Sequence, residues 1–483
     1  MLDPGLIRAE PARVQAALGR RGMAAEAVQG AAECDARWLA RQAVADALRT
    51  RRRRASEEVA RAKTAGEPTD DLERLGLQIA EELRRARRDL ARLDAERRLA
   101  LLDLPNLPAP EVPEETAVLD EPASLPARGG MTHWDLVQVL DLAHTAAGHG
   151  TLAGRAPGSG TARAVAGCRG STAARRQATA RLPCQGGRAR EASAGRGFLI
   201  WRGQGARLLR ALAAFMLDVH ARDFGYEEVR CPSVATREAL EGSAHLPALE
   251  EKMYAVLAPG TDRSLTLAAS NDNDLFLIPR AEPHLANLFR GQVLDAGALP
   301  ARFVASGPAF RREADHGGAA GRGLLRLHEF PTVEVYAFCR PEESEAELAR
   351  AVEAATKILA RLEVPHRRLL RGARSLSQAA AKTIDLEVWA GASGRWLGVA
   401  ALSSFTDYQA RRTNTRFRGA DGKPRLVHTV GGAAVAIPHL VAALVENGQE
   451  ADGSVRLPEA LRPYTGGLDR LRPPEPSDAR GTK

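Results

Sequence analysis

Residues 302–334 read R-F-V-A-S-G-P-A-F-R-R-E-A-D-H-G-G-A-A-G-R-G-L-L-R-L-H-E-F-P-T-V-E, and the rest of the chain is organised around this stretch. Residues 302–310 are mostly apolar and favour an extended strand. Residues 315–323 include four glycines and predict a flexible loop. Residues 324–334 then alternate between apolar and polar side chains, which is typical of a half-buried strand. We therefore expect two strands joined by a glycine-rich loop.

Side chains two apart on a strand share a face. Phe330, Thr332 and Glu334 should therefore point the same way, and so should Arg311 and Glu313. A guanidinium, carboxylates and an aromatic ring over one pocket suit a triphosphate, an amine and an adenine ring. An ordinary surface hairpin with a charged face explains this stretch equally well when it is taken alone, because charged strand faces are common.

The composition indicates a soluble protein of two or three domains with a polyanionic partner. The chain has 483 residues, a formal net charge of +8 and a pI of about 9.6, which favours nucleic acid as a partner. No apolar run is long enough to span a membrane, and the first residues lack the apolar core of a signal peptide. The scattered cysteines form no CxxC pair, so we expect a reducing, cytoplasmic compartment and no structural zinc. They are Cys34, Cys168, Cys184, Cys231 and Cys339.

An antiparallel helical hairpin is predicted near the N-terminus. Residues 27–63 contain little Gly or Pro, and Gly66-Glu67-Pro68 interrupts the pattern before a second helix that ends near Leu102. Apolar residues recur on this second helix at steps of three and four between Leu72 and Leu93. At about 1.5 Å per residue each arm should be about 50 Å long.

Four consecutive arginines, 51–54, lie on the first arm. The plain interpretation is a solvated helix face. The functional interpretation is a grip on the phosphate backbone of a nucleic acid.

Composition also suggests the domain boundaries. Residues 1–103 form the N-terminal domain, 104–130 a Pro- and Glu-rich linker, 131–467 a second, larger domain, and 468–483 a disordered tail. Residues 148–196 are basic and have no apolar periodicity, so we interpret them as a disordered insertion or a gene-model error.

The pattern over 131–467 alternates short strands and helices. We expect helices over 133–147, 206–222 and 342–362, strands over 226–232, 275–282, 384–389 and 396–403, and a helix over 433–446 that starts after a Gly-Gly pair. Helix N-termini favour anions, so this last helix suggests a ligand-binding end.

Several stretches match one known family independently. They are the chain start at 1–21, the helical hairpin, 206–232, 310–334, Thr406-Asp407-Tyr408-Gln409-Ala410-Arg411-Arg412, and Asp452-Gly453-Ser454-Val455 with 457–464. On these motifs the chain resembles bacterial-type seryl-tRNA synthetases, which belong to the class II aminoacyl-tRNA synthetases. The resemblance implies an α+β fold, in which a helical hairpin (coiled coil) precedes a catalytic domain on a mostly antiparallel sheet flanked by helices.

The resemblance also implies a reaction and a set of site residues. Serine is joined to the α-phosphate of ATP, with Mg²⁺ as cofactor, and is then transferred to tRNA that the hairpin holds, in a homodimer. Arg311 matches the catalytic guanidinium at the α-phosphate. Glu313 matches an acid that contacts ATP, and Phe330 the ring that stacks on adenine. Glu282 and Glu334 match the acids that shape the serine pocket.

The sequence departs from the family pattern at positions that, in the family, bind serine, Mg²⁺ and ATP. Arg280 replaces a threonine of the serine-binding turn, where a guanidinium has the wrong sign for the substrate ammonium. Gly398 and Ala401 replace the glutamate and serine used for Mg²⁺, and carry no oxygen ligand. Gly431 and Ala433 replace the asparagine and serine of an Asn-Gly-Ser motif. His439 replaces the arginine that holds the γ-phosphate, and it forms no bidentate fork.

Three hypotheses follow from this mixture. The chain is a serine–tRNA ligase that tolerates the changes; or a non-catalytic paralogue that binds tRNA or another partner; or an activating enzyme for a different acyl substrate, whose carboxylate Arg280 receives. The sequence places no metal ligand set at the site.

Overall fold

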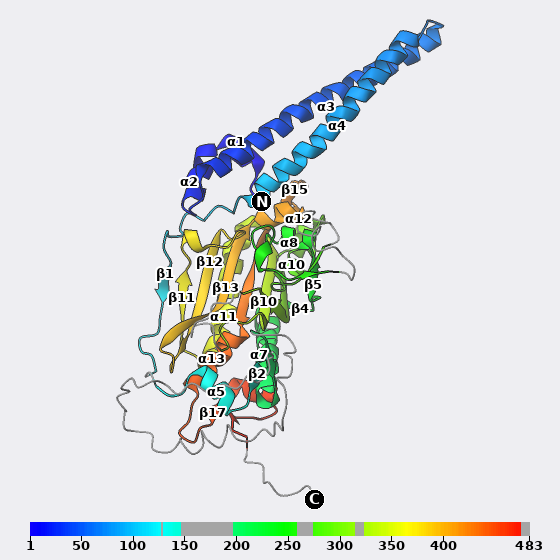
Figure 1. Ribbon diagram of the computed structural model, residues 1–483. Coiled ribbons are helices and arrows are strands. Elements are labelled where there is room, and N and C mark those ends of the chain that lie inside the picture. Colours follow the sequence, from blue (N-terminus) through cyan, green and yellow to red (C-terminus); the bar gives the residue numbers. More distant parts are fainter. Residues whose placement is uncertain (127–128, 146–196, 258–273, 314–322, 475–483) are drawn as a thin grey trace, which may run out of the picture.

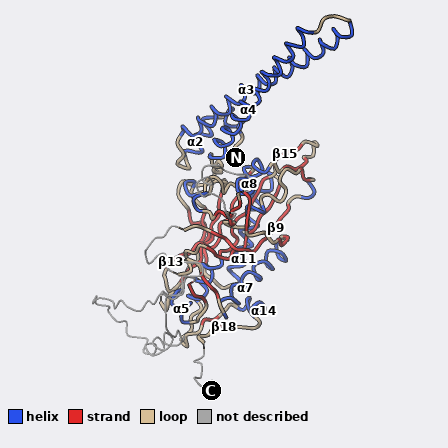
Figure 2. Tube along the Cα trace, turned by 45° about the vertical axis from the view of Figure 1, so that its right-hand side comes forward, coloured by secondary structure: helices blue, strands red, loops and turns tan. Residues whose placement is uncertain are grey.

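The computed structural model describes residues 1–126, 129–145, 197–257, 274–313 and 323–474 (Figure 1). The predicted insertion at 148–196, most of the glycine loop at 315–323 and the tail from 475 lie outside these residues. A long helical arm projects from one end of a domain built on a large sheet (Figures 1 and 2). The expected α+β architecture is confirmed.

The arm is an antiparallel pair of helices, as predicted. Two short helices, α1 (Pro4–Ala9) and α2 (Pro11–Gly19), precede α3 (Ala25–Ala65) and α4 (Asp70–Asp103). Gly66 ends α3 with a φ of +72°, a conformation that glycine adopts without steric cost. Along the arm, small and branched side chains are buried in a seam between the two helices: Ala45, Leu48, Ala55, Ile79, Leu83 and Ala86.

The base of the arm is fixed to the sheet domain by polar contacts. The guanidinium of Arg21 donates to the carbonyl oxygens of Asn106, Leu376, Ser377 and Ala380 at 2.7–3.2 Å. The N-terminal ammonium of Met1 donates to the carbonyl of Tyr408 at 2.5 Å. Apolar residues of α1–α3 also share one buried cluster with the sheet domain.

In the described part of the chain, the largest sheet has eight strands in the order β1-β11-β12-β13-β16-β10-β9-β4. Neighbours are antiparallel except for the parallel pair β4 and β9. The strands are β1 (Ala117–Asp120), β4 (Glu227–Val229), β9 (Ala301–Phe310), β10 (Glu329–Cys339), β11 (His366–Leu370), β12 (Lys382–Ala390), β13 (Arg395–Thr406) and β16 (His428–Ala436).

Helices cover one face of this sheet. They are α5 (His133–Val139), α7 (Gly203–Asp218), α11 (Ser344–Arg361) and α13 (Ile437–Asn447), and their apolar residues form the main core with the strands. Val333 and Val335 of β10 point into this core, so Phe330, Thr332 and Glu334 face the other way. The opposite face of the sheet is therefore left to carry the site.

Smaller elements surround the sheet. They are α8 (Arg237–Gly242), α10 (Glu282–Leu285), α12 (Tyr408–Thr413), α14 (Arg462–Thr465), β2 (Ala143–Thr145) paired with β3 (Leu199–Trp201), β5 (Val234–Thr236), β6 (Ala255–Val256) and β7 (Leu275–Leu277) in one sheet, β8 (Val293–Leu294), β14 (Arg416–Arg418) and β15 (Pro424–Leu426) in another, and β17 (Val455–Arg456) paired with β18 (Arg470–Leu471).

The structure corrects the prediction of a helix start at 433. Gly431 and Gly432 lie inside β16, and α13 begins only at Ile437. A Cβ on Gly431 would come within 2.7 Å of the carbonyl oxygen of Val335, and one on Gly432 within 2.0 Å of that of Ala401. Glycine therefore stands here because the two neighbouring strands approach closely, and not to open a helix.

Three further predictions are corrected. The helix from 133 ends at Val139, because Asp141 takes a positive φ of 53° and β2 follows. The stretch 104–130 is not a free linker, since β1 pairs with β11 and the side-chain amide of Asn106 donates to the carbonyls of Ala379 and Phe405. The tail from 468 is ordered as far as β18.

Candidate functional site

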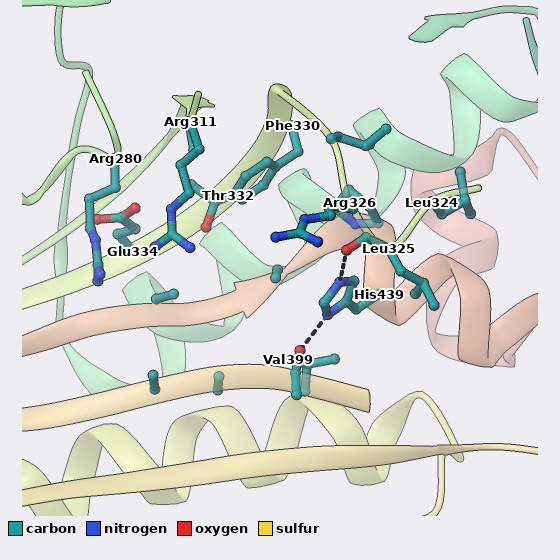
Figure 3. A pocket seen from close by; sticks show the side chains of 18 of the residues that line it. Arg280, Arg311, Leu324, Leu325, Arg326, Phe330, Thr332, Glu334, Val399 and His439 are labelled. Carbon is teal, nitrogen blue, oxygen red and sulfur yellow. Dashed lines mark hydrogen bonds between the residues drawn. The ribbon is translucent and has the colours of Figure 1, made fainter. Parts of the chain in front are cut away.

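A cavity of about 480 Å³ lies on the face of the sheet that the core helices leave open (Figure 3). Its walls come from β10, from the end of β9, and from the turn that precedes α10. Its floor comes from β12, β13 and β16, and the first turn of α13 closes one side. Of the residues predicted for the site, Arg280, Arg311, Glu313, Phe330, Glu334, Gly398, Ala401, Ala433 and His439 line this cavity.

The alternation of side chains along β10 places every second residue on the cavity side. Phe330, Thr332 and Glu334 all line the cavity, as the two-residue period predicted. Arg311 and Glu313 also line it, although β9 already ends at Phe310. The backbone N–H of Arg311 still donates to the carbonyl of His328 at 2.8 Å, which keeps the two sides of the hairpin together beyond the strand.

A buried pair of glutamates meets the guanidinium of Arg280 at one end of the cavity. Arg280 lies 3.4 Å from Glu282, and the backbone N–H of Glu282 donates to Glu334 at 3.1 Å. The side-chain amide of Gln409 holds Glu282 at 2.8 Å. Figure 3 shows Arg280 directly beside Glu334.

Burial dominates the titration of both acids. It raises the pKa of Glu282, and it raises the pKa of Glu334 to about 7. Arg280 opposes both shifts, and the neighbouring charge of Glu282 adds to the shift of Glu334. Arg280 therefore supplies the positive charge that this acid pair lacks.

Arg311 lies next to this cluster with its guanidinium in the cavity (Figure 3). The residue as a whole is exposed to solvent, but protein atoms crowd around its guanidinium. This burial, together with the nearby Arg280, lowers the pKa of Arg311. Within the described part of the chain its guanidinium forms no ion pair or side-chain hydrogen bond. Glu313, by contrast, is paired with Arg326 at 2.9 Å.

The floor of the cavity carries two acids that the sequence reasoning missed. Asp385 and Glu387 of β12 stand opposite Ala401 and Gly398 of β13 and share their face. Both acids are engaged. Arg371 donates to both oxygens of Asp385. Arg367 donates from Nε to Glu387 at 2.8 Å, and its Nη2 lies 2.7 Å from the same carboxylate oxygen.

This donor set does not fit a magnesium ion. Gly398, Ala401 and Ala433 offer no side-chain oxygen, and the nearby carboxylates are already held by guanidinium groups. Magnesium requires near-octahedral oxygen ligation. No group of three or more His, Cys, Asp or Glu residues suited to a metal ion occurs in the segments that the structure describes.

His439 is tied between two parts of the cavity wall. Its Nδ1 lies 2.6 Å from the carbonyl oxygen of Gly398, and its Nε2 lies 3.1 Å from that of Leu325 (Figure 3). The ring therefore links α13 to β13 and to the turn before β10.

Four charged lining residues were absent from the sequence prediction: Arg326, Arg371, Asp385 and Glu387. The strand 384–389 did carry a usable signal, because its acids alternate with Ile384, Leu386 and Val388 and must share the face opposite the core.

Comparison with known proteins shows which family the chain belongs to. Residues 1–108 match the seryl-tRNA synthetase N-terminal domain, and residues 265–448 match the class II tRNA synthetase core domain (G, H, P, S and T). A serine–tRNA ligase of Gemmatimonas aurantiaca is 38% identical over 432 residues, covering 87% of this chain and 88% of that protein. The chain belongs to the seryl-tRNA synthetase family.

Other family members align over still more of the chain. A serine–tRNA ligase of Pelotomaculum thermopropionicum is 33% identical and covers 98% of this chain and 100% of its own length. The seryl-tRNA synthetase of Pyrococcus horikoshii, solved in complex with ATP, superposes with a TM-score of 0.77 at 27% identity and covers 98% of this chain and 100% of its own. This synthetase-family chain has no helix long and apolar enough to cross a membrane among the residues described.

Proposed function

We propose that this family member binds tRNA and keeps a nucleotide pocket, but activates serine very slowly or not at all. The observation that carries the proposal is the position of Arg280, whose guanidinium lies 3.4 Å from the buried Glu282. By resemblance, Glu282 and Glu334 shape the pocket for serine. Arg280 already provides the cation that a substrate ammonium would bring, so serine would have to displace it.

The other departures from the family pattern should also lower the rate of serine activation. A magnesium ion has no free oxygen ligands on the β13 wall, and both ring nitrogens of His439 are occupied by backbone carbonyls. Removing one preorganised charge-stabilising donor commonly costs about 2.7–4 kcal/mol in such sites. Several losses together should leave adenylation very slow, although their effects are not additive.

Binding of serine-type tRNA through the helical hairpin is part of the proposal. The relatives named as serine–tRNA ligases support it, and so do the exposed arginines 51–54 on α3. A homodimer with α7 and β4 at the interface, an adenine nucleotide in the cavity and a cytoplasmic location complete it, each implied by the resemblance.

Serine-dependent ATP–pyrophosphate exchange tests the proposal. The wild-type chain should run at least about 1,000-fold more slowly than the Gemmatimonas aurantiaca ligase assayed in parallel. The quadruple variant Arg280→Thr, Gly398→Glu, Ala401→Ser, His439→Arg should recover much of the difference. Exchange by the wild type at a rate similar to the relative's would overturn the proposal.

A second candidate function rests on the same arginine. Arg280 lines the cavity, so an acyl substrate with a second carboxylate has a guanidinium to meet there. This candidate predicts exchange that depends on an acidic amino acid and that Arg280→Thr abolishes. The pairing of Arg280 with Glu282 makes it the weaker alternative, and silence across a panel of acidic substrates would end it.

A further inference from the structure

The charges around the cavity are almost all matched within the protein itself. Arg326 pairs with Glu313, Arg371 with Asp385, and Arg280 with Glu282. A ligand therefore finds few charges that are still unpaired. Arg311 is the exception among the cavity-lining arginines, as far as the described residues extend.

The position of Arg311 indicates where the cavity would bind an anion. In Figure 3 its guanidinium lies between the Arg280–Glu334 end and the ring of Phe330. A guanidinium whose charged form is disfavoured by desolvation and by a neighbouring cation gains from one added negative group. Phe330, half-buried on the adjoining strand, offers a ring surface for a base.

The other side of the cavity is unsuited to further phosphates. His439 spans from the carbonyl of Gly398 to that of Leu325, so both of its ring nitrogens face backbone oxygens. Gly398, Leu325 and the acids of β12 also line the cavity, and these acids are already paired with Arg371 and Arg367. A divalent cation would normally offset the charge of a triphosphate, but this wall has no ligand set to hold one.

We propose that the cavity binds a nucleoside 5′-monophosphate without a divalent cation, and that it discriminates against the magnesium–triphosphate complex. Arg311 holds the single phosphate, and Phe330 stacks on the base. His439 closes the space that the β- and γ-phosphates would need. The inference deepens the proposed function, since a pocket that rejects the triphosphate cannot start adenylation.

Direct binding to the full-length protein tests the inference, with neither serine nor tRNA present. Isothermal titration calorimetry with AMP should give the same dissociation constant, within about twofold, in excess EDTA and in millimolar Mg²⁺. ATP should bind at least about tenfold more weakly than AMP in both buffers. The inference would be overturned if Mg²⁺ increased the affinity for ATP, if the two nucleotides bound with equal affinity, or if AMP did not bind at millimolar concentration.

Two variants assign the effect to residues. Arg311→Gln should weaken AMP by about tenfold or more, while Arg418→Gln, which changes an exposed arginine of β14 outside the cavity, should not. His439→Arg should improve ATP relative to AMP, and thermal melting should show that each variant is folded. An unchanged ATP-to-AMP ratio in His439→Arg would reject the role of the His439 bridge.

The outcome is separable from that of the exchange assay. Serine-dependent exchange by the wild type would defeat the proposed loss of activation. Magnesium-dependent ATP binding without any exchange would leave that loss standing and reject only the monophosphate preference.

Discussion

Among single residues, Glu334 shows how burial in the site couples to the stability of the whole chain. Its pKa is raised to about 7 in the folded state, mainly by burial, against an ordinary value of 4.5. Between these two pH values the folded state binds more protons than the unfolded state, so the free energy of unfolding must fall as pH rises through this window.

We predict that Glu334→Gln removes this component. Over pH 4.5–7 the wild type should lose roughly 3 kcal/mol of stability that the variant does not lose, since one pKa unit corresponds to about 1.4 kcal/mol. Urea denaturation at several pH values measures the difference. Glu459→Gln, at an exposed surface glutamate, serves as the control and should keep the wild-type slope.

Replacing Arg280 should shift the pH dependence of stability to higher pH. Its guanidinium lowers the pKa of Glu334, so Arg280→Thr should move the end of the stability loss to higher pH. Denaturation of this variant beside the wild type checks the shift. An unmoved profile would mean that Arg280 does not act on the acid pair in solution.

At the scale of elements, the α3–α4 arm presents its arginines to solvent. Residues 51–54 are all exposed, and Arg53 lies 3.7 Å from the exposed Glu57, a pairing that contributes little at a surface. Glutamine has a similar helix propensity, so replacing the four arginines should leave the helix intact.

We predict that the quadruple Arg→Gln variant at 51–54 weakens tRNA binding and its salt dependence. The slope of log affinity against log salt should become shallower by up to about 3, if each arginine contacts one phosphate. Filter binding at several salt concentrations measures it. The triple variant Arg416→Gln, Arg418→Gln, Arg425→Gln on β14 and β15 is the control, and an equal effect per charge removed would indicate general rather than local attraction.

For the molecule as a whole, Arg21 fixes the arm to the sheet domain. Burial lowers the pKa of its guanidinium to about 10, yet four carbonyl oxygens from two segments, Asn106 and residues 376–380, hold it in place. This joint is one of the contacts that hold the arm on the sheet domain, together with the Met1 ammonium and the shared apolar cluster.

We predict that Arg21→Met destabilises the chain by roughly 2–3 kcal/mol, because it leaves several buried carbonyls without a donor. Hydrogen exchange should rise at the base of α2 and in residues 376–380. Arg13→Met, at an exposed arginine of α2, should leave both measurements unchanged. A loss of stability without faster exchange at the joint would place the effect elsewhere.

Local patterns predicted much of this molecule. The three-and-four spacing from Leu72 to Leu93 predicted the arm, and the alternation at 324–334 predicted which side chains of β10 reach the cavity. Both succeed because helix and strand periods are properties of neighbouring residues. The family motifs supplied the order of the remaining elements.

Contacts between distant residues decided the rest. The pairing of Arg371 with Asp385 and of Arg367 with Glu387 depends on which strands become neighbours, and the Gly431-Gly432 pair belongs to a strand because β10 and β13 close around it. The sequence by itself determined the family, the arm and the residue types of the site. Only the tertiary structure decided that the guanidinium of Arg280 lies against the buried glutamates, and that His439 bridges two backbone carbonyls of the cavity wall. Both contacts depend on segments brought together across the sheet.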